Sequence, residues 1–221
     1  MKRRCAALAL LVLPSIVRSQ SAAPPALVAA AERGDVDTLR RLLDAATPVN
    51  ARDARGRNAV LAATQGGHVA AARLLIERGA DVNAQDDIDD SAFLLAGARG
   101  LSGIVRAALG ATPPPDLKRV NRYGGTALIP ACHHGHVETV RVLLTTAIDV
   151  NHINRLGWTA LLEAIILGDG GAAHTEIVRL LLARKAEPNL ADAHGVTPLA
   201  HAEQRGQREI AQLLRTAGAK P

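Results

Sequence analysis

Cysteine and histidine gather in the pentapeptide Cys132-His133-His134-Gly135-His136, the densest group of metal-ligand types in the chain. Thiolate and imidazole are ligands that zinc and other transition metals accept. Gly135 breaks the helix on which a ligand pair would need to lie, and a closed set of four ligands is not visible. Free cysteine is among the most buried residue types, which favours a structural role for Cys132. We therefore predict no metal, and a metal-dependent protein that uses Cys132, His133 and His134 is the alternative.

Glu163 and Asp169 are a second candidate for chemistry, because two nearby carboxylates could face one another as an acid and a base. Most other carboxylates recur at turn positions, as Asp53 and Asp86 do, where aspartate bonds its own backbone. A carboxylate pair without a partnered base is weak support for catalysis. The glycine-rich segment 168–171 lacks the strand and the spacing of a phosphate-binding or dinucleotide-binding loop. We therefore predict that the chain is not an enzyme and holds no cofactor.

The elements that would position any site follow from a repeat in the glycines. Successive glycines at the end of an apolar run are separated by 33, 33, 35, 33 and 38 residues, by subtraction of their numbers. A second mark lies eleven residues before each of the last five, and only one of these marks departs from glycine. Self-similarity at a fixed period is the signature of a repeat architecture. The two series are Gly34, Gly67, Gly100, Gly135, Gly168 and Gly206, and Gly56, Asp89, Gly124, Gly157 and Gly195.

Each period contains two short apolar runs with helical spacing. Leu39, Leu42 and Leu43 show the spacing of three and four residues that marks one buried helix face. Gly79 follows a helical run at the place where a left-handed residue ends a helix. Thr126 is predicted to cap the helix that follows it, since its hydroxyl can accept an unpaired N–H of the first turn.

This unit resembles the ankyrin repeat. The motifs that carry the resemblance are Thr197-Pro198-Leu199, the Gly-His turn at Gly67-His68 and the closing Val82-Asn83, and they cover about residues 26 to 219. The resemblance implies an all-α solenoid of about six helix-turn-helix repeats with short finger loops. Within the predicted ankyrin repeat domain, 22–221, the repeats are 22–52, 53–85, 86–118, 119–153, 154–191 and 192–221.

The chain departs from the family at several places. The family's histidine after leucine is replaced by Leu61, Leu94, Ile129, Leu162 and Ala200, so we expect stacking to rely more on apolar contact. The third repeat has Asp89 for glycine, Gly103 inside its second helix and a proline run, 113–115. We expect that repeat to be the softest joint. Residues 169–173 are an insertion in the turn between the two helices of the fifth repeat.

Residues 1–21 have the pattern of a signal peptide. A basic start at residues 2–4 precedes the apolar stretch Cys5 to Val17, and small residues such as Ser19 and Ser21 offer cleavage sites. We predict a periplasmic or secreted protein, with an uncleaved membrane anchor as the alternative. Cleavage leaves Cys132 as a lone cysteine, so stability must come from packing between repeats.

The net charge does not indicate a nucleic-acid partner. The formal charge is +5, from 26 basic and 21 acidic residues. Four of the basic residues precede Gln20, so 26 − 4 = 22 remain against 21 acidic residues, a balance of +1. The high pI therefore belongs mostly to the segment that the predicted cleavage would remove, and a basic footprint is not supported. We expect no nucleic acid, no membrane contact after cleavage, and a monomer.

The resemblance implies a binding surface made of finger residues, the exposed ends of the first helices and the concave face. Aromatic and arginine residues dominate binding hot spots, and Tyr123 and Trp158 fall on adjacent fingers. The predicted function is non-catalytic binding of another protein, with a secreted effector that binds host proteins as the alternative. The predicted contact residues are Arg55, Arg57, Asp87, Asp90, Arg99, Arg122, Tyr123, His133, His134, Arg155, Leu156, Trp158, His194 and Arg205.

Overall fold

The computed structural model describes residues 25–220, so the predicted signal peptide lies outside the described residues. All regular elements in this range are helices, which confirms the predicted all-α class. Within the described range, no helix is long and apolar enough to cross a bilayer. The helices are α1 Ala26–Glu32, α2 Val36–Asp44, α3 Ala59–Gly66, α4 Val69–Glu77, α5 Ala92–Ala98, α6 Ser102–Leu109, α7 Leu128–His133, α8 Val137–Leu143, α9 Ala160–Ile166, α10 Ala172–Ala183, α11 Pro198–Gln204 and α12 Arg208–Thr216.

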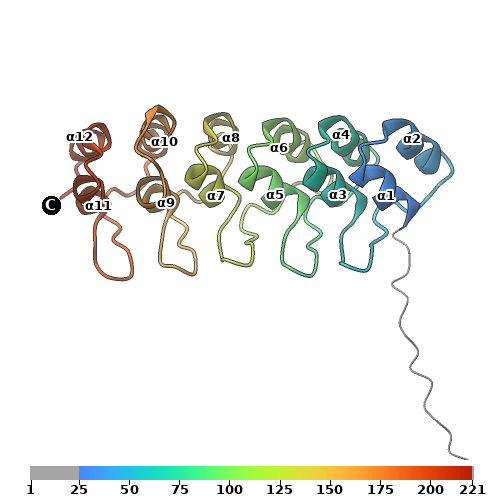
Figure 1. Ribbon diagram of the computed structural model, residues 1–221, viewed down its shortest axis with the longest axis horizontal. Coiled ribbons are helices and arrows are strands. Elements are labelled where there is room, and N and C mark those ends of the chain that lie inside the picture. The colour runs from blue at the N-terminus through green and yellow to red at the C-terminus, as the bar shows by residue number, and fades with distance from the viewer. Residues whose placement is uncertain (1–24, 221) are drawn as a thin grey trace, which may run out of the picture.

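The helices form a row of antiparallel pairs with two layers (Figure 1). The first helices of the pairs carry the odd numbers from α1 to α11 and stack on one another in one layer. The second helices carry the even numbers from α2 to α12 and stack in the other layer. Loops project from the first-helix layer between consecutive pairs, and we call these loops the fingers (Figure 1). Each pair therefore contacts only its neighbours, which is the geometry of a solenoid.

The core runs the whole length of the described chain. It consists of leucine, isoleucine, valine and alanine from both layers, with Phe93 as its largest buried side chain. Alanine pairs such as Ala62 and Ala63 are fully buried in the first helices. Small side chains allow neighbouring first helices to approach closely, so the fingers that precede them lie in a regular row.

Four of the first helices begin with a polar cap. Asn58, Ser91, Thr159 and Thr197 each accept a hydrogen bond from the backbone N–H three residues later. Pro198 occupies the start of α11, as predicted, where the missing N–H costs no helical bond.

The prediction that Thr126 caps α7 is wrong. Its hydroxyl has no hydrogen-bond partner although it is buried, and α7 begins two residues later, at Leu128. The cause is Pro130, because proline has no N–H to donate to the carbonyl four residues before it. The N–H of Ile129 bonds the carbonyl of Thr126 instead, at 3.3 Å, so it is not available to the hydroxyl.

The fingers turn at a residue with a left-handed backbone. This residue has a φ of +74°, +62°, +74°, +78° and +78° in the five fingers, and Asp89 adopts it as the glycines do. Aspartate tolerates this conformation better than most residues. Gly168 does not have a positive φ, whereas Gly170 has +71°. The insertion has therefore moved the left-handed turn of the fifth repeat by two residues, from 168 to 170.

Polar bonds join each repeat to the next, so the expectation of mainly apolar stacking is incomplete. A side chain near the helix-helix turn donates to or contacts a carbonyl at the end of the preceding first helix. Most of these carbonyls accept no N–H from their own helix end, and only that of Thr64 also accepts from the N–H of Gly67. The pairs are His68 with Glu32 at 3.1 Å, Arg99 with Thr64 at 3.1 Å, His136 with Ala98, His174 with His133 at 2.9 Å, and Gln207 with Ile165 at 3.1 Å.

A second set of polar bonds, an asparagine ladder, joins the repeats after the second helices, where the fingers begin. Asn50 accepts from the backbone N–H of Asp81 at 2.8 Å, and Asn83 accepts from that of Asp116 at 2.7 Å. Asn151 and Asn189 continue the ladder in the later repeats. Lys118 occupies this place in the third repeat and cannot accept a hydrogen bond. The ladder is therefore interrupted between the third and fourth repeats.

We predict that Lys118→Asn closes this gap and stabilises the protein. The local turn is already suitable, because the N–H of Lys118 bonds Asp116 at 3.0 Å as that of Asn83 bonds Asp81 at 2.8 Å. The new amide should reach the N–H of Asp149 and the carbonyl of Ala147, for a gain of about 1 kcal/mol. A urea melt measures this gain.

Asn83→Lys is the matched control, since it removes a rung that exists and should destabilise by a similar amount. A melt of Lys118→Asn that coincides with that of the unchanged protein would show that the third joint does not limit stability.

Candidate functional site

The tips of three neighbouring fingers expose large apolar side chains. Ile88, Tyr123 and Leu156 each directly precede the left-handed residue and have exposed fractions of 51%, 60% and 55%. We call these three residues the apolar ridge. Tyr123 and Leu156 were predicted contact residues, whereas Ile88 was missed, although its place before Asp89 gives the same signal. Contiguous exposed apolar residues mark interaction surfaces.

A hollow of about 380 Å³ lies beside the ridge, between the fingers and the first helices of the third, fourth and fifth repeats. Its walls combine apolar side chains with two carboxylates, one guanidinium and two imidazoles. The lining residues are Asp90, Leu95, Ala98, Asn121, Arg122, Tyr123, Ile129, Pro130, His133, His134, Leu156, Glu163 and Leu167.

Arg122 organises the finger side of the hollow. Its guanidinium lies 3.1 Å from the carboxylate of Asp90 and 5.0 Å from the ring centre of Tyr123. Burial raises the pKa of Asp90, and the positive charge of Arg122 opposes this shift. The carbonyl of Tyr123 accepts from the N–H of Arg155 at 3.0 Å, which joins the two fingers. The fingers that carry the ridge are therefore joined to one another by hydrogen bonds.

Glu163 lies at the base of the hollow with an exposed fraction of 5%, and every residue of its helix, α9, is buried. One carboxylate oxygen accepts from the amide of Asn154 at 2.8 Å. The other is 3.5 Å from Nδ1 of His133. Burial raises the pKa of Glu163. The pKa of His133 is lowered by burial and by the neighbouring His134, so its imidazole is neutral at neutral pH.

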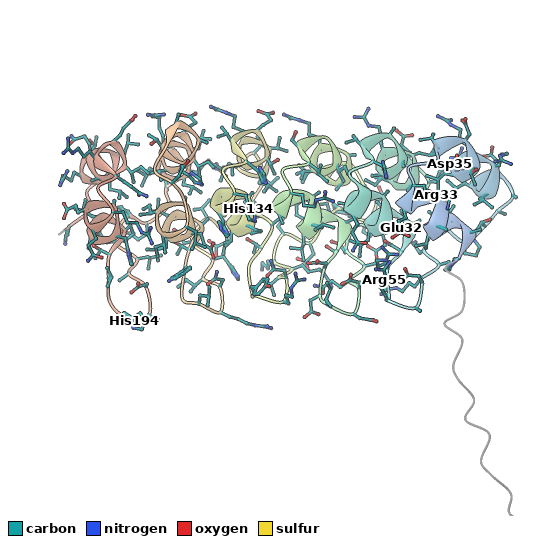
Figure 2. The ribbon with its side chains drawn as sticks, viewed as in Figure 1. Glu32, Arg33, Asp35, Arg55, His134 and His194 are labelled. Atoms are coloured by element: carbon teal, nitrogen blue, oxygen red, sulfur yellow. The ribbon has the colours of Figure 1, made fainter. Side chains whose placement is uncertain are left out.

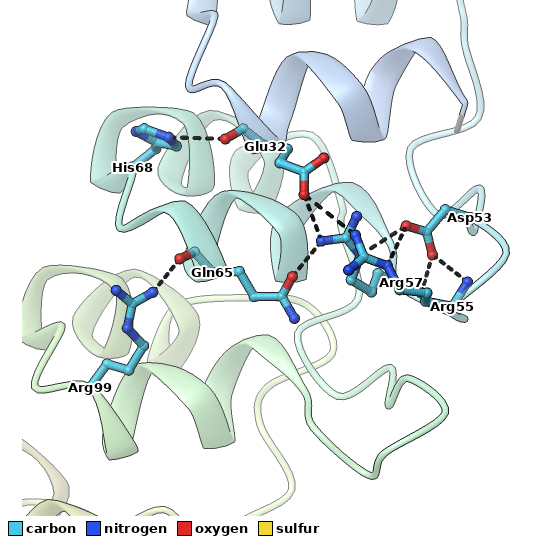
Figure 3. Close-up of polar contacts among 7 residues, drawn as sticks. All are labelled: Glu32, Asp53, Arg55, Arg57, Gln65, His68 and Arg99. Carbon is cyan, nitrogen blue, oxygen red and sulfur yellow. Dashed lines mark hydrogen bonds and ion pairs between the residues drawn. The ribbon is translucent and has the colours of Figure 1, made fainter. Parts of the chain in front are cut away.

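Arg57 is a correction to the predicted surface. It was predicted to contact a partner, but it is 2% exposed and belongs to an interior network (Figure 3). Its guanidinium bonds Asp53 at 2.8 Å, Glu32 at 3.0 Å and Gln65 at 2.5 Å. Burial alone would raise the pKa of Asp53, but hydrogen bonds from Arg57 hold this pKa below its ordinary value. Arg57 therefore holds the finger of the second repeat against the first repeat.

The other predicted contact residues lie on fingers or near the ends of first helices and differ in how far they are exposed. Arg55 and His194 lie on fingers at opposite ends of the row, and His134 lies where α7 ends (Figure 2). Asp87, Arg155 and Arg205 are exposed. Arg99 is exposed but donates to the carbonyl of Thr64, so part of its capacity is used within the stack. Trp158 is half-buried and does not line the hollow.

The Cys132–His136 segment does not form a metal centre among the described residues. No three histidine, cysteine, aspartate or glutamate side chains in the described range converge on one point. Cys132 is buried, and burial strongly raises the pKa of its thiol. The rings of His133 and His134 stack on one another, with centres 4.2 Å apart.

Glu163 and Asp169 are not an acid–base pair. Asp169 accepts from the N–H of Gly171 and contacts His174, each at 2.8 Å, whereas Glu163 bonds Asn154. His174 in turn reaches the carbonyl of His133. Asp169 therefore orders the insertion and orients one of the bonds between repeats.

We predict that Arg57→Ala destabilises the protein by about 3–5 kcal/mol, because it removes the hydrogen-bonded cation of the buried carboxylate of Asp53 and leaves only the exposed Arg55 at 3.9 Å. Arg55→Ala is the matched control. The Arg55 side chain is 64% exposed, and its loss should cost about 0–1 kcal/mol. Chemical denaturation of both variants measures the difference, and equal midpoints would show that the interior network contributes nothing.

We predict that Glu163→Gln becomes more stabilising, relative to the unchanged protein, as the pH rises from about 4 to about 8. The folded state raises the pKa of Glu163 above 4.5, so it binds the proton more tightly than the unfolded state does. The contribution of Glu163 to stability is therefore present below pH 4.5 and is lost as the pH rises through the raised pKa. Paired melts across this range test it, and a difference that is independent of pH would contradict it.

Comparisons with known proteins agree with this geometry. The model of the family described as ankyrin repeats (3 copies) matches residues 5–86 and 93–192. The chain is 43% identical over 197 residues to YahD, an ankyrin repeat protein of Escherichia coli K12, covering 89% of this chain and 97% of that protein. It is 54% identical to an ankyrin repeat domain from Acinetobacter baumannii AYE, with a TM-score of 0.84 over 88% of this chain and 98% of that one.

A more distant likeness concerns the fold alone. A chain in the structure of the predatory endopeptidase Bd0816 from Bdellovibrio bacteriovorus, in complex with the immunity protein Bd3460, has a TM-score of 0.72 at 22% identity. The match covers 86% of this chain and 97% of that chain.

The repeat period, the paired helices, the finger turns and the family match lead to one conclusion. The chain belongs to the ankyrin repeat family.

Proposed function

We propose that the chain is a non-catalytic module that binds another protein through its fingers and the adjoining face of the first helices. The apolar ridge carries this proposal. Three large apolar side chains at finger tips lie outside the core. Their exposure to water is unfavourable, and a partner that covers them would remove this penalty. Ankyrin repeats bind other proteins, and the ridge lies on the face from which the fingers project.

The third, fourth and fifth repeats form the centre of the proposed surface. The ridge and the hollow lie side by side there, since Tyr123 and Leu156 belong to both. An aromatic anchor beside a hollow is the arrangement of an interface hot spot. The exposed arginines on the same fingers, Arg122 and Arg155, form a polar edge around it.

The place of action that we propose is the bacterial periplasm or the outside of the cell. The basic start and the apolar stretch of residues 1–21 support export. A secreted effector that binds host proteins is the alternative, and it uses the same surface. Fractionation of periplasm and culture supernatant separates these two locations.

We predict that the double variant Tyr123→Ala, Leu156→Ala loses partner binding while its thermal melt stays almost unchanged. Both side chains are mostly exposed, so truncation removes contact area from the partner and not from the core. The unchanged protein and the double variant serve as baits. Mass spectrometry identifies the proteins that each bait retains from periplasmic extract and from culture supernatant.

Arg73→Ala on α4 is the control bait, because Arg73 is exposed on the second-helix layer. A partner retained equally by all three baits would place the interface elsewhere. A lowered melting temperature in the double variant would instead show that the ridge stiffens the fingers.

A further inference from the structure

We propose that the hollow receives a lysine or arginine side chain of the partner, whose cation pairs with Glu163. This inference rests on the proposed function, since it specifies the chemistry of the segment that the surface binds. It starts from a buried carboxylate that lines an open hollow and that, among residues 25–220, is paired with no lysine or arginine and only approaches the imidazole of His133.

Two other carboxylates near the fingers receive a guanidinium from within the chain. Asp53 is paired with Arg57 at 2.8 Å, and Asp90 with Arg122 at 3.1 Å. Asp192 contacts the imidazole of His201 at 2.8 Å and accepts hydrogen bonds from two backbone N–H groups of its own finger. These contacts compensate the loss of water around a buried charge.

Glu163 is different, because its neighbours are an amide and a neutral imidazole. Asn154 donates one hydrogen bond, and His133 lies at 3.5 Å from the second oxygen, too far for a strong bond. His201 occupies the place of Glu163 in the sixth repeat and faces Asp192, the counterpart of Asn154. The fifth repeat therefore has a carboxylate on the first helix and an amide on the finger, whereas the sixth repeat has an imidazole on the helix and a carboxylate on the finger.

The formal charge of the hollow also favours a cation. Asp90 and Arg122 neutralise one another, so ionised Glu163 leaves a charge of one negative unit when histidine is counted as neutral. A partner carboxylate would meet this charge in a site of low dielectric, where repulsion is strong. A partner ammonium or guanidinium would relieve it.

The walls suit the stem of a long basic side chain. Leu156, Leu167 and Ile129 give the hollow apolar sides, and the ring of Tyr123 stands at its edge. Lysine and arginine pack their methylene groups along such surfaces while the charged end finds a polar partner. A cation that passes an aromatic ring gains additional attraction.

The experiment begins with a displayed library of random twelve-residue peptides, selected separately on four forms of the mature chain. These are the unchanged protein, Glu163→Gln, the double variant Tyr123→Ala, Leu156→Ala, and the control Glu138→Gln. Glutamine keeps the oxygen that accepts from Asn154 and removes only the charge. Glu138 carries the same change on the exposed face of α8.

We expect the unchanged protein and Glu138→Gln to enrich peptides with a basic residue at one fixed position, and Glu163→Gln to lose this preference. The best peptide is then synthesised with its basic residue and with a neutral isostere, citrulline for arginine or norleucine for lysine. Calorimetry should show a loss of at least about tenfold for the neutral peptide on the unchanged protein. The loss should vanish on Glu163→Gln.

Other outcomes overturn specific parts. Peptides that need Tyr123 and Leu156 but show no basic preference would reject the role of Glu163 and leave the proposed function intact. Peptides that bind equally to Glu163→Gln would show that a protonated or purely structural Glu163 suffices. Failure to select any peptide that depends on Tyr123 and Leu156 would reject the proposed surface itself.

The melting temperature of the free Glu163→Gln variant distinguishes a binding role of Glu163 from a structural role. A carboxylate retained for binding should raise the melting temperature of the free protein, or leave it unchanged, when glutamine replaces it. A Glu163→Gln variant that melts earlier and weakens every peptide in equal proportion would assign Glu163 to the scaffold.

Discussion

The stack depends on hydrogen bonds from each repeat to the helix end of the repeat before it. A helix leaves its last carbonyls unpaired, and a buried carbonyl without a donor costs about 1–3 kcal/mol. His68 supplies the donor at the first joint. Leu101 stands in the equivalent turn of the third repeat and cannot do so, and Arg99 reaches the carbonyls of Thr64 and Gln65 instead. The identity of the donor varies between repeats, while the need for a donor does not.

This constraint on the helices leaves the finger tips free to vary. Each finger is held by its turn and by the first helix that follows it, so the residue before the left-handed position is free to project into water. Arg55, Ile88, Tyr123, Leu156 and His194 occupy that place in successive fingers. Their chemical diversity contrasts with the uniform core, and it is on such variable loops over a rigid scaffold that function resides. The apolar ridge is therefore a property of this chain and not of its fold.

The period of the sequence predicts the helices well because they depend on local spacing, and the resemblance adds the order in which they stack. Side chains whose role depends on a neighbouring repeat are less predictable. Arg57 has the register of a finger residue, yet Glu32 of the first repeat and Gln65 of α3 draw it into the interior. Thr126 has the sequence of a cap, but the missing N–H of Pro130 changes the turn. Tyr123 and Leu156 were predictable because exposure at a finger tip follows from register alone.

Glu163 illustrates why the candidate site could be only partly read from the sequence. Its spacing identifies a position on a first helix, but its surroundings combine the buried helix α9, the finger of Asn154 and the ring of His133. A carboxylate in such surroundings lowers stability when it ionises, whereas the carboxylates of Asp53 and Asp90 are paired with arginines of the chain. The simplest explanation for an uncompensated charge beside an exposed apolar ridge is that a cation of the partner pairs with it in the complex. The ridge would then provide contact area, and Glu163 would decide which side chain the hollow accepts.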